Sequence, residues 1–248
     1  MTVEAIKKEV AFVCLPEYFN CYGVEACELP VTVKNWQSIL DDLCRLAREY
    51  RSYIILPVIQ PIEDAYRNRA YLINTQGEIA GFYDKTHITI TEKQDMGIVA
   101  GDQVKTFDTE YGRVGIVICY DIYFPELFAS LRRQRPDMIF FPSLQRSDHE
   151  LANTALVQTR AMDTQAYIVR SSFGCPLDVP WTKDMMFGQS AVVHPDGTIL
   201  ANAGHYEGVA LAHVTLPFTW QRTRCGGYGP MPVRDFLHED GRPELYKP

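Results

Sequence analysis

The chain has 248 residues and a formal net charge of −7, with 46% hydrophobic and 22% charged residues. This composition provides enough apolar side chains for a sizeable core and does not match that of a disordered chain. Recognition of nucleic acid needs clustered Lys and Arg, so no nucleic-acid partner is expected. No apolar run approaches the roughly 20 residues that span a bilayer, and charged residues replace a signal peptide's apolar stretch in residues 1–10. We therefore expect one soluble domain with no membrane partner, because no linker divides the chain.

The seven cysteines show neither metal-site nor redox-motif spacing. No two of them form a CxxC pair, and none has zinc-type spacing to the six histidines. This pattern predicts a reducing, cytoplasmic setting with no metal and no cofactor. A redox protein is a weak alternative, because such a protein would use paired cysteines.

The N-terminal half predicts buried strands and one amphipathic helix, whose apolar residues recur at steps of three and four. We expect the strands at residues 10–15, 53–59, 69–74 and 79–83, and the helix at residues 33–50. Pro16 closes the first strand, so Glu17 lies at its C-terminal end. Gly77 can take the positive φ of a hairpin turn between the last two strands, and Lys85 follows that hairpin.

The C-terminal half alternates strands with helices. We expect strands at residues 112–119, 138–141 and 167–171, helices at residues 125–133 and 150–163, and a hairpin turning at residues 195–197. Pro125 favours the first turn of its helix, which places Cys119 on a strand-to-helix turn. Strands that alternate with helices indicate a layered α/β protein. Residues 217–248, rich in Gly and Pro, predict an extended tail rather than a further domain.

Three residues that could do chemistry follow apolar strands, at the end where layered α/β folds gather their sites. Taken singly, Cys119 would be a core residue, Glu17 a strand-end carboxylate and Lys85 a surface lysine. Their shared position favours a common site. The free N–H groups at the strand-to-helix turn predict a lowered pKa for the Cys119 thiol, and the same groups could hold an oxyanion.

Three segments resemble, in chain order, the glutamate, lysine and cysteine motifs of the nitrilase (carbon-nitrogen hydrolase) superfamily. They are Leu15-Pro-Glu17-Tyr-Phe, Tyr83-Asp-Lys85-Thr-His87 and Gly115-Ile-Val-Ile-Cys119-Tyr-Asp-Ile-Tyr-Phe-Pro-Glu126. Residues 160–167, 188–197 and 240–246 also resemble family segments, so the resemblance covers nearly the whole chain. The sequence is thus identified as a member of this superfamily.

The resemblance implies a four-layer αββα sandwich that commonly forms a homodimer. Residues 1–216 would form the hydrolase domain. Residues 217–248 would form an extended tail that belongs to the same domain and takes part in a dimer contact. Family members normally have a strand before the glutamate motif, whereas only 16 residues precede Glu17 here, so we expect the usual first strand to be missing.

The resemblance also assigns roles. Cys119 would attack a small amide to form a thioester, and Glu17 would act as the general base. Lys85 and the backbone N–H of Tyr120 would stabilise the oxyanion. The reaction would release ammonia or a small amine without a cofactor.

Several further residues are candidates for the pocket. Many relatives carry a second glutamate, for which Glu92 is the best match and Glu110 a weaker one; a solvated loop charge is the competing interpretation of Glu92. Tyr18 and Tyr120 are predicted to line the pocket, although aromatic residues more often pack in cores. His87, Asp121 and Glu126 are expected to fix the local structure.

The sequence also offers three arginines that could anchor a substrate carboxylate. We take Arg146 as the candidate, with Arg160 and Arg170 as alternatives and a structural ion pair as the competing interpretation of each. Two departures from the family pattern lie at Asp163, where a glutamate is usual, and at residues 171–174, where an asparagine is expected.

Cys119-Tyr120-Asp121 resembles the amidase branches, including those that hydrolyse ω-amides of dicarboxylic acids, rather than the nitrile-hydrolysing members. The expected substrate is therefore a small-molecule amide. A hydrolase of carbamoyl (ureido) compounds is the main alternative. A catalytically silent scaffold of the same fold is another, although the intact Glu17, Lys85 and Cys119 argue against it.

Overall fold

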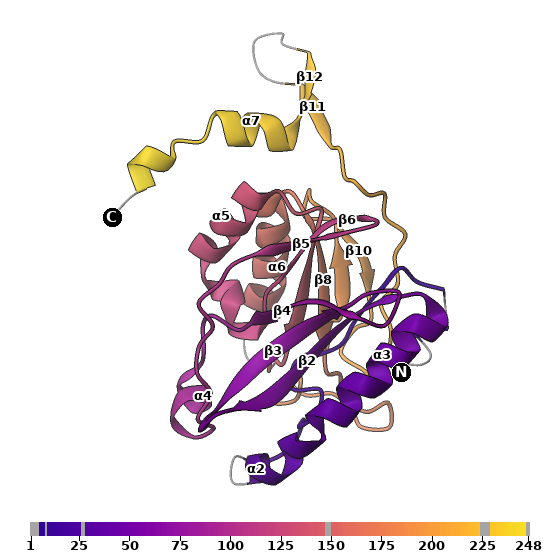
Figure 1. Ribbon diagram of the computed structural model, residues 1–248. Coiled ribbons are helices and arrows are strands. Elements are labelled where there is room, and N and C mark those ends of the chain that lie inside the picture. Colours follow the sequence, from indigo (N-terminus) through magenta and orange to yellow (C-terminus); the bar gives the residue numbers. More distant parts are fainter. Residues whose placement is uncertain (1–4, 8, 26–27, 147–149, 224–228, 247–248) are drawn as a thin grey trace.

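The computed structural model describes residues 5–7, 9–25, 28–146, 150–223 and 229–246 (Figure 1). Two β-sheets carry helices on their outer faces, and the two sheets face each other (Figure 1). No helix formed by the described residues is long and apolar enough to cross a membrane.

The first sheet has the strand order β1-β2-β3-β4. Its strands are β1 (Phe12–Cys14), β2 (Tyr53–Ile62), β3 (Ala65–Ile73) and β4 (Ile79–Asp84). β1 runs parallel to β2, and the other pairs are antiparallel. The four predicted strands are confirmed, with β2 and β3 extended to a second hairpin that the sequence analysis missed. β1 is the edge of this sheet, and no described residue before Phe12 belongs to a strand.

Helix α3 (Trp36–Tyr50) covers the outer face of the first sheet (Figure 1). It follows the short helices α2 (Leu29–Thr32) and η2 (Val33–Asn35). Leu40, Leu43 and Ala47, spaced by three and four residues, pack against Ile54 and Leu56 of β2. The predicted helical face is therefore the one that is buried.

The second sheet has the strand order β10-β9-β8-β7-β6-β5. Its strands are β5 (Thr106–Thr109), β6 (Gly112–Ile116), β7 (Met138–Ser143), β8 (Tyr167–Ser172), β9 (Ala191–Val193) and β10 (Ile199–Asn202). β6, β7 and β8 run parallel, and the outer pairs are antiparallel. Sequence analysis missed β5, an edge strand with no fully buried residue.

Helices α5 (Pro125–Gln134) and α6 (Glu150–Thr164) cover the outer face of the second sheet (Figure 1). Phe128 and Val157 of these helices pack against Ile139 and Ile168 of the sheet. A further apolar cluster lies between the two sheets and includes Ile55, Leu72, Ile116 and Phe140. Three apolar layers thus separate four layers of secondary structure, which confirms the predicted αββα sandwich.

The sequence analysis predicted an extended tail after residue 216. The tail instead contains regular secondary structure. It contains a two-stranded ribbon of β11 (Gln221–Thr223) and β12 (Pro230–Pro232), the helix α7 (Val233–Glu239) and the short helix η5 (Pro243–Tyr246). Phe218 still packs between the sheets. The sequence analysis missed α7 because it is short and the surrounding prolines and glycines suggested irregular structure. Tyr228, which belongs to this tail, lies outside the described residues.

Arg234 joins α7 to the second sheet. Its Nη1 donates to Asp137 Oδ1 at 2.8 Å, and its Nε donates to the carbonyl of Gln165 at 3.0 Å. Asp137 is 6% exposed and also accepts from the N–H of Arg113 at 3.0 Å. The start of α7 is therefore held by its own chain.

We predict that Arg234→Met lowers the free energy of unfolding by about 2 kcal/mol, because it removes the cation from a buried carboxylate. Chemical denaturation measures this change. Arg45→Met is the control, since Arg45 pairs with Asp42 on an exposed surface and should lose less than about 1 kcal/mol. Equal effects of the two substitutions would contradict the role given to Arg234.

Candidate active site

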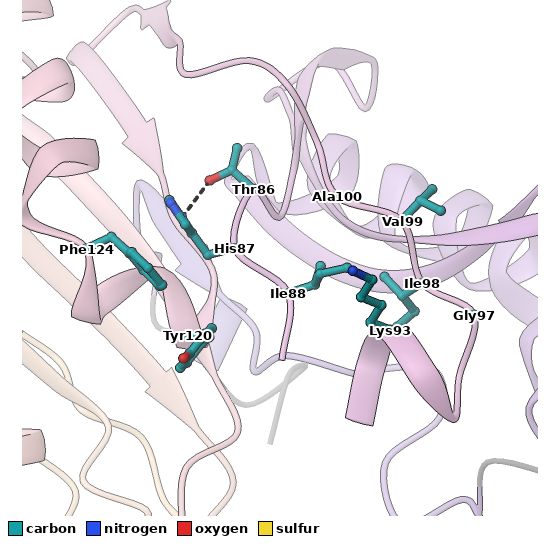
Figure 2. A pocket seen from close by; sticks show the side chains of 10 residues that line it. All are labelled: Thr86, His87, Ile88, Lys93, Gly97, Ile98, Val99, Ala100, Tyr120 and Phe124. Carbon is teal, nitrogen blue, oxygen red and sulfur yellow. Dashed lines mark hydrogen bonds between the residues drawn. The ribbon is translucent and has the colours of Figure 1, made fainter. Parts of the chain in front are cut away.

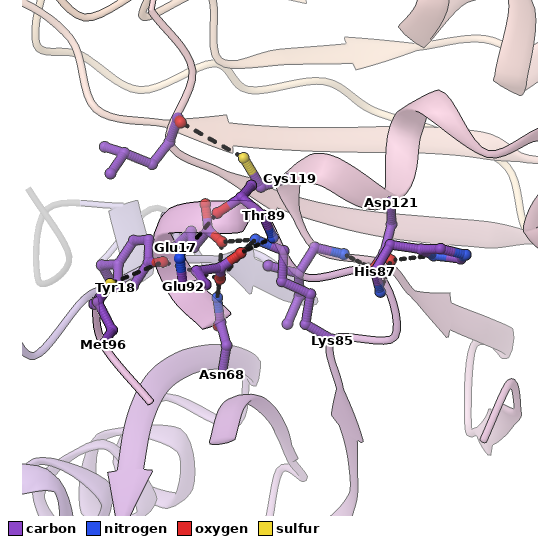
Figure 3. A network of polar contacts seen from close by, with 12 residues as sticks. Glu17, Tyr18, Asn68, Lys85, His87, Thr89, Glu92, Met96, Cys119 and Asp121 are labelled. Carbon is purple, nitrogen blue, oxygen red and sulfur yellow. Dashed lines mark hydrogen bonds and ion pairs between the residues drawn. The ribbon is translucent and has the colours of Figure 1, made fainter. Parts of the chain in front are cut away.

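Glu17, Lys85 and Cys119 meet where the two sheets face each other (Figure 3). Glu17 follows β1, Lys85 follows β4, and Cys119 follows β6. Lys85 Nζ lies 2.8 Å from Glu17 Oε1, and the two residues are 2% and 0% exposed. The strand ends therefore bring together the three residues that the sequence motifs selected.

Glu92 completes a buried group of charges. Both of its carboxylate oxygens lie 2.8 Å from Lys85 Nζ. It is the third residue of α4 (Ile90–Gln94), where its Oε2 accepts from the N–H of Thr89 at 2.8 Å and its own N–H donates to Thr89 Oγ1 at 3.2 Å. This capping box fixes the carboxylate toward the lysine. Glu110, the weaker sequence candidate, is exposed and contacts Thr75 instead.

Asn68, in the middle of β3, was missed by the sequence analysis. Its Nδ2 donates to Glu17 Oε1 at 2.8 Å and to Glu92 Oε1 at 3.0 Å, and the residue is 1% exposed. Its backbone carbonyl accepts from the N–H of Lys85 at 2.9 Å. Asn68 lies between Arg67 and Arg69 and precedes the strand predicted from residue 69, so no local pattern marked it. Its partners lie far away in the sequence.

The charges of this group do not balance, since two carboxylates share one ammonium. Burial lowers the pKa of Lys85, but Glu17 and the other nearby anions outweigh it and raise the pKa above its usual value. Burial also raises the pKa of Glu92, but Lys85 and hydrogen bonds to its carboxylate hold the pKa below its usual value. Burial and the charge of Glu92 keep the pKa of Glu17 above its usual value despite Lys85. Glu17 is therefore the carboxylate that takes up a proton more readily.

Cys119 is the first residue of the helix η3 (Cys119–Tyr123), between β6 and α5, and has a φ of 45°. A positive φ is costly for any residue with a Cβ, so the surrounding contacts must hold this turn. Cys119 is partly buried, and its sulfur donates to the carbonyl of Leu144 at 3.5 Å. The carboxylate of Glu17 is close enough to influence the thiol, and its Oε2 is buried without a hydrogen-bond partner among the described residues.

The expectation of a lowered thiol pKa is wrong. Burial and the negative charge of Glu17 raise the pKa of Cys119 well above its usual value, although Lys85 acts in the opposite direction. The N–H groups at the start of η3 do not compensate for these two effects. The resting side chain is therefore a neutral thiol.

Asp121 holds the cysteine turn against the lysine loop. Its buried carboxylate accepts from the N–H of Ile118 at 2.9 Å, from the Tyr83 hydroxyl at 2.8 Å and from the N–H of His87 at 3.0 Å. The ring of His87 also bonds to Asp121 and stacks on Phe124, with ring centroids 3.7 Å apart. Both residues therefore have the structural contacts that the sequence analysis expected.

Tyr18 and Tyr120, which were predicted to line one pocket, lie in two different places. The Tyr18 hydroxyl donates to Glu92 Oε1 at 2.9 Å, so it contacts the charged group directly. The ring of Tyr120 instead lines a groove of about 580 Å³ with His87, Lys93 and Phe124 (Figure 2). Glu17, Lys85 and Cys119 do not line this groove. The N–H of Tyr120 lies in the first turn of η3, where N–H groups have no partner within the helix.

The three candidate arginines have different surroundings. Arg146, the chosen candidate, is exposed. Arg160 donates to the carbonyl of Ile122 at 3.1 Å and pairs with Asp163 at 3.0 Å, so it makes a structural ion pair. Arg170 is 3% exposed and donates through Nη2 to Gln145 Oε1 at 2.7 Å. Among the described residues, no group of three His, Cys, Asp or Glu side chains could hold a metal ion.

Comparison with known proteins identifies two human amidases that are similar to this chain. Human omega-amidase NIT2 is 30% identical over 224 residues, which cover 86% of this chain and 79% of that protein. Human deaminated glutathione amidase is 28% identical over 259 residues, which cover 98% and 76% of the two chains.

Solved structures share the fold. Nit3 of Saccharomyces cerevisiae, described as a member of branch 10 of the nitrilase superfamily, has a TM-score of 0.68 and 25% identity over 84% of this chain and 78% of its own. A mutant of the Nesterenkonia AN1 amidase has a TM-score of 0.78 and 19% identity over 98% and 87% of the two chains. The carbon-nitrogen hydrolase pattern itself matches residues 1–224. The chain therefore belongs to the carbon-nitrogen hydrolase family, within the nitrilase superfamily that its three sequence motifs predicted.

Proposed function

We propose that this protein is an amidase that hydrolyses a small-molecule amide through a thioester on Cys119. The observation that carries the proposal is the buried carboxylate of Glu17, which acts on the Cys119 thiol and whose Oε2 has no hydrogen-bond partner among the described residues. An unpartnered carboxylate oxygen next to a thiol can receive its proton. A thiol activated in this way can attack an amide carbonyl, which is otherwise a poor electrophile.

Acylation begins with this proton transfer. The raised pKa of Cys119 makes a free thiolate rare, so Glu17 removes the proton as sulfur attacks the carbonyl carbon. The raised pKa of Glu17 makes it a stronger base than an ordinary glutamate. The carbonyl oxygen becomes negative and is stabilised by Lys85 Nζ and the N–H of Tyr120. One such donor typically contributes about 3–4 kcal/mol to the transition state.

Glu17 then acts as the acid and afterwards as the base again. The C–N bond breaks as Glu17 gives its proton to the nitrogen, which leaves as ammonia or an amine and leaves a thioester on Cys119. Glu17 next takes a proton from water, whose oxygen attacks the thioester carbonyl. The sulfur leaves as the thiolate, recovers the proton from Glu17, and the carboxylic acid is released.

Glu92, Asn68 and Tyr18 orient the reacting groups in this proposal. Glu92 keeps Lys85 charged and in place, through contacts of 2.8 Å. Asn68 and Tyr18 occupy carboxylate lone pairs that would otherwise accept from water. Glu17 Oε2 is thereby left for the thiol.

Amide hydrolysis is favoured over the alternatives for different reasons. The human relatives that match over most of this chain are named as amidases, which supports an amide rather than a nitrile substrate. A carbamoyl substrate would use the same three residues and release carbon dioxide with ammonia. A silent scaffold would have no need for the buried, mutually oriented charges of Glu17, Lys85 and Glu92.

We predict that the wild type releases ammonia from small amides faster than from the matching carbamoyl compounds and nitriles, and that Cys119→Ala releases none. Alanine removes the nucleophile from a turn that Asp121 still holds, so the melting temperature should change little. Intact mass of the wild type, quenched during turnover, should show an acyl adduct on the chain. Unchanged turnover by Cys119→Ala would remove the basis of the proposal.

The acid limb of the pH profile provides a second prediction. Glu17 must be ionised to act as base, so kcat/KM should fall as the pH drops through its raised pKa. Glu92→Gln removes a negative charge near Glu17, so that Glu17 is the one carboxylate of the pair that still interacts with the Lys85 ammonium. Both changes lower the pKa of Glu17. The acid limb should therefore move to lower pH, whatever the loss in maximal rate. Glu110→Gln, at an exposed site, should leave the limb unchanged; an unmoved limb in Glu92→Gln would contradict the assignment.

The proposal includes a homodimer in a reducing, cytoplasmic setting. Free thiols at Cys14, Cys21 and Cys175 suit a reducing compartment. Leu151 on α6 and Leu245 in the tail are 82% and 63% exposed, and a second copy could cover them.

Light scattering at micromolar concentration should therefore give twice the chain mass of 28.3 kDa. Removal of residues 221–248, which keeps the buried Phe218, should shift the protein toward monomer. A monomeric wild type, or a shortened form that remains a dimer, would refute the dimer contact.

A further inference from the structure

Tyr22 and Phe173 form an aromatic stack that joins the two halves of the sandwich. Tyr22 lies in the loop after β1 of the first sheet, and Phe173 directly follows β8 of the second sheet. Their ring centroids are 3.9 Å apart, and the ring planes differ by 14°. Tyr22 is nevertheless 45% exposed, so the stack lies at the surface of the protein.

Phe173 lies close to the contact that the Cys119 sulfur makes. β7 and β8 are parallel, and their last paired residues are Ser143 and Ser172. Leu144 and Phe173 are therefore the next residues of two neighbouring chains, and such chains lie about 5 Å apart in a β-sheet. The carbonyl of Leu144 accepts from the Cys119 thiol at 3.5 Å.

Backbone hydrogen bonds keep these two chains together beyond the ends of the strands. The N–H of Phe187 donates to the carbonyl of Gln145 at 2.8 Å, and the N–H of Gly188 donates to the carbonyl of Phe173 at 3.1 Å. The same short segment thus holds the loop after β7 and the loop after β8. The backbone of Phe173 is fixed beside the loop that contacts the cysteine.

Tyr22 lies close to Glu17, on the other side of the reacting groups. Burial and the negative charge of Glu17 raise the pKa of the Cys21 thiol, directly before Tyr22, to about 12. The side chain of Asn20 anchors this loop to β2, because it donates to the carbonyl of Ile59 and accepts from its N–H, both at 2.9 Å. The backbone that carries Tyr22 is therefore fixed as well.

The stack spans the space outside Cys119. The Cys119 thiol interacts with the carboxylate of Glu17 and with the carbonyl of Leu144. Tyr22 belongs to the loop that continues from Glu17, Phe173 lies beside Leu144, and the two rings meet. Glu17 is 0% exposed whereas Tyr22 is 45% exposed, so the rings lie farther out than the reacting groups.

We propose that the Tyr22–Phe173 stack is the outer wall of the substrate entrance and limits the size of the group that can reach Cys119. The inference rests on the proposed amidase function and narrows its substrates to short amides, against amides with a bulky acyl group. Both rings stand on anchored backbone, so a large group would have to displace them from their stack. Displacement of packed side chains is costly, and the cost grows with the size of the inserted group.

Alkylation of the Cys119 thiol tests the size limit without turnover. Iodoacetamide and its N-phenyl derivative, iodoacetanilide, form the same C–S bond with loss of iodide and differ in size. Peptide mass spectrometry gives both rates at Cys119, and their ratio cancels changes in the reactivity of the thiol itself. Cys44, a free cysteine on α3, is the reference within the chain. The ratio of iodoacetanilide to iodoacetamide should be at least about tenfold lower at Cys119 than at Cys44.

Tyr22→Ala and Phe173→Ala should each raise this ratio at Cys119 by about tenfold, because each opens the wall. Phe173→Leu keeps a smaller apolar side chain and should give an intermediate ratio, even if Phe173→Ala lowers the melting temperature. Tyr111→Ala is the matched control and should keep the wild-type ratio. Tyr111 is 39% exposed and packs edge-on against Phe12, but it precedes β6 whereas Cys119 follows it. A ratio at Cys119 that is the same in the wild type and in both alanine variants would overturn the size limit.

Turnover extends the test to substrates. The wild type should hydrolyse propionamide with a higher kcat/KM than 3-phenylpropionamide, and Tyr22→Ala and Phe173→Ala should shift that preference toward the bulky amide by about tenfold. If the wild type hydrolyses no amide, the amidase proposal fails, while the alkylation ratios still decide the size limit. If amides are hydrolysed and neither alanine variant changes the alkylation ratio or the preference, the size limit is wrong and the amidase proposal stands.

Discussion

The amine of Lys85 lies between two buried carboxylates, and the remaining features of the site follow from that uneven charge. A buried group of two anions and one cation is stable only when hydrogen bonds satisfy the excess negative charge. Asn68, Tyr18 and the N–H of Thr89 provide those bonds. They reach every carboxylate oxygen of the pair except Glu17 Oε2, which has no hydrogen-bond partner among the described residues. The need to satisfy buried charge thus leaves free the oxygen to which we assign the role of base.

The three residues meet only if the two sheets keep a fixed separation and orientation. Glu17 and Lys85 end strands of the first sheet, and Cys119 ends a strand of the second. The apolar layer between the sheets fixes their separation, while the carboxylate of Asp121 ties the cysteine turn to Tyr83 and to the lysine loop. Apolar packing therefore sets the spacing coarsely, and one buried carboxylate adjusts the position of the reacting groups.

Sequence patterns predicted a layered α/β protein because periodic apolar residues, which are a local feature, marked α3 and the central strands. The four layers and the candidate residues Glu17, Lys85 and Cys119 followed from three motifs that resemble the nitrilase superfamily, and the strand ends gave these residues a shared position. Asn68 was missed because its importance arises only when β3 meets residues 24 and 51 positions away in the chain. The thiol pKa was predicted in the wrong direction for a similar reason, since the turn is local whereas burial and Glu17 are tertiary effects.

The left-handed backbone of Cys119 limits how this enzyme can change. A residue held at a φ of 45° by the surrounding hydrogen bonds has little freedom to follow a moving substrate. The position of the Cys119 sulfur is thus fixed. Residues that bind the parts of a substrate remote from its carbonyl carbon must therefore discriminate between substrates. Evolution of new specificity on this scaffold would alter the loops after β7 and β8 while the cysteine turn stays constant. Loss of activity by drift would most readily leave glycine at position 119, because glycine has no Cβ and adopts that conformation without strain.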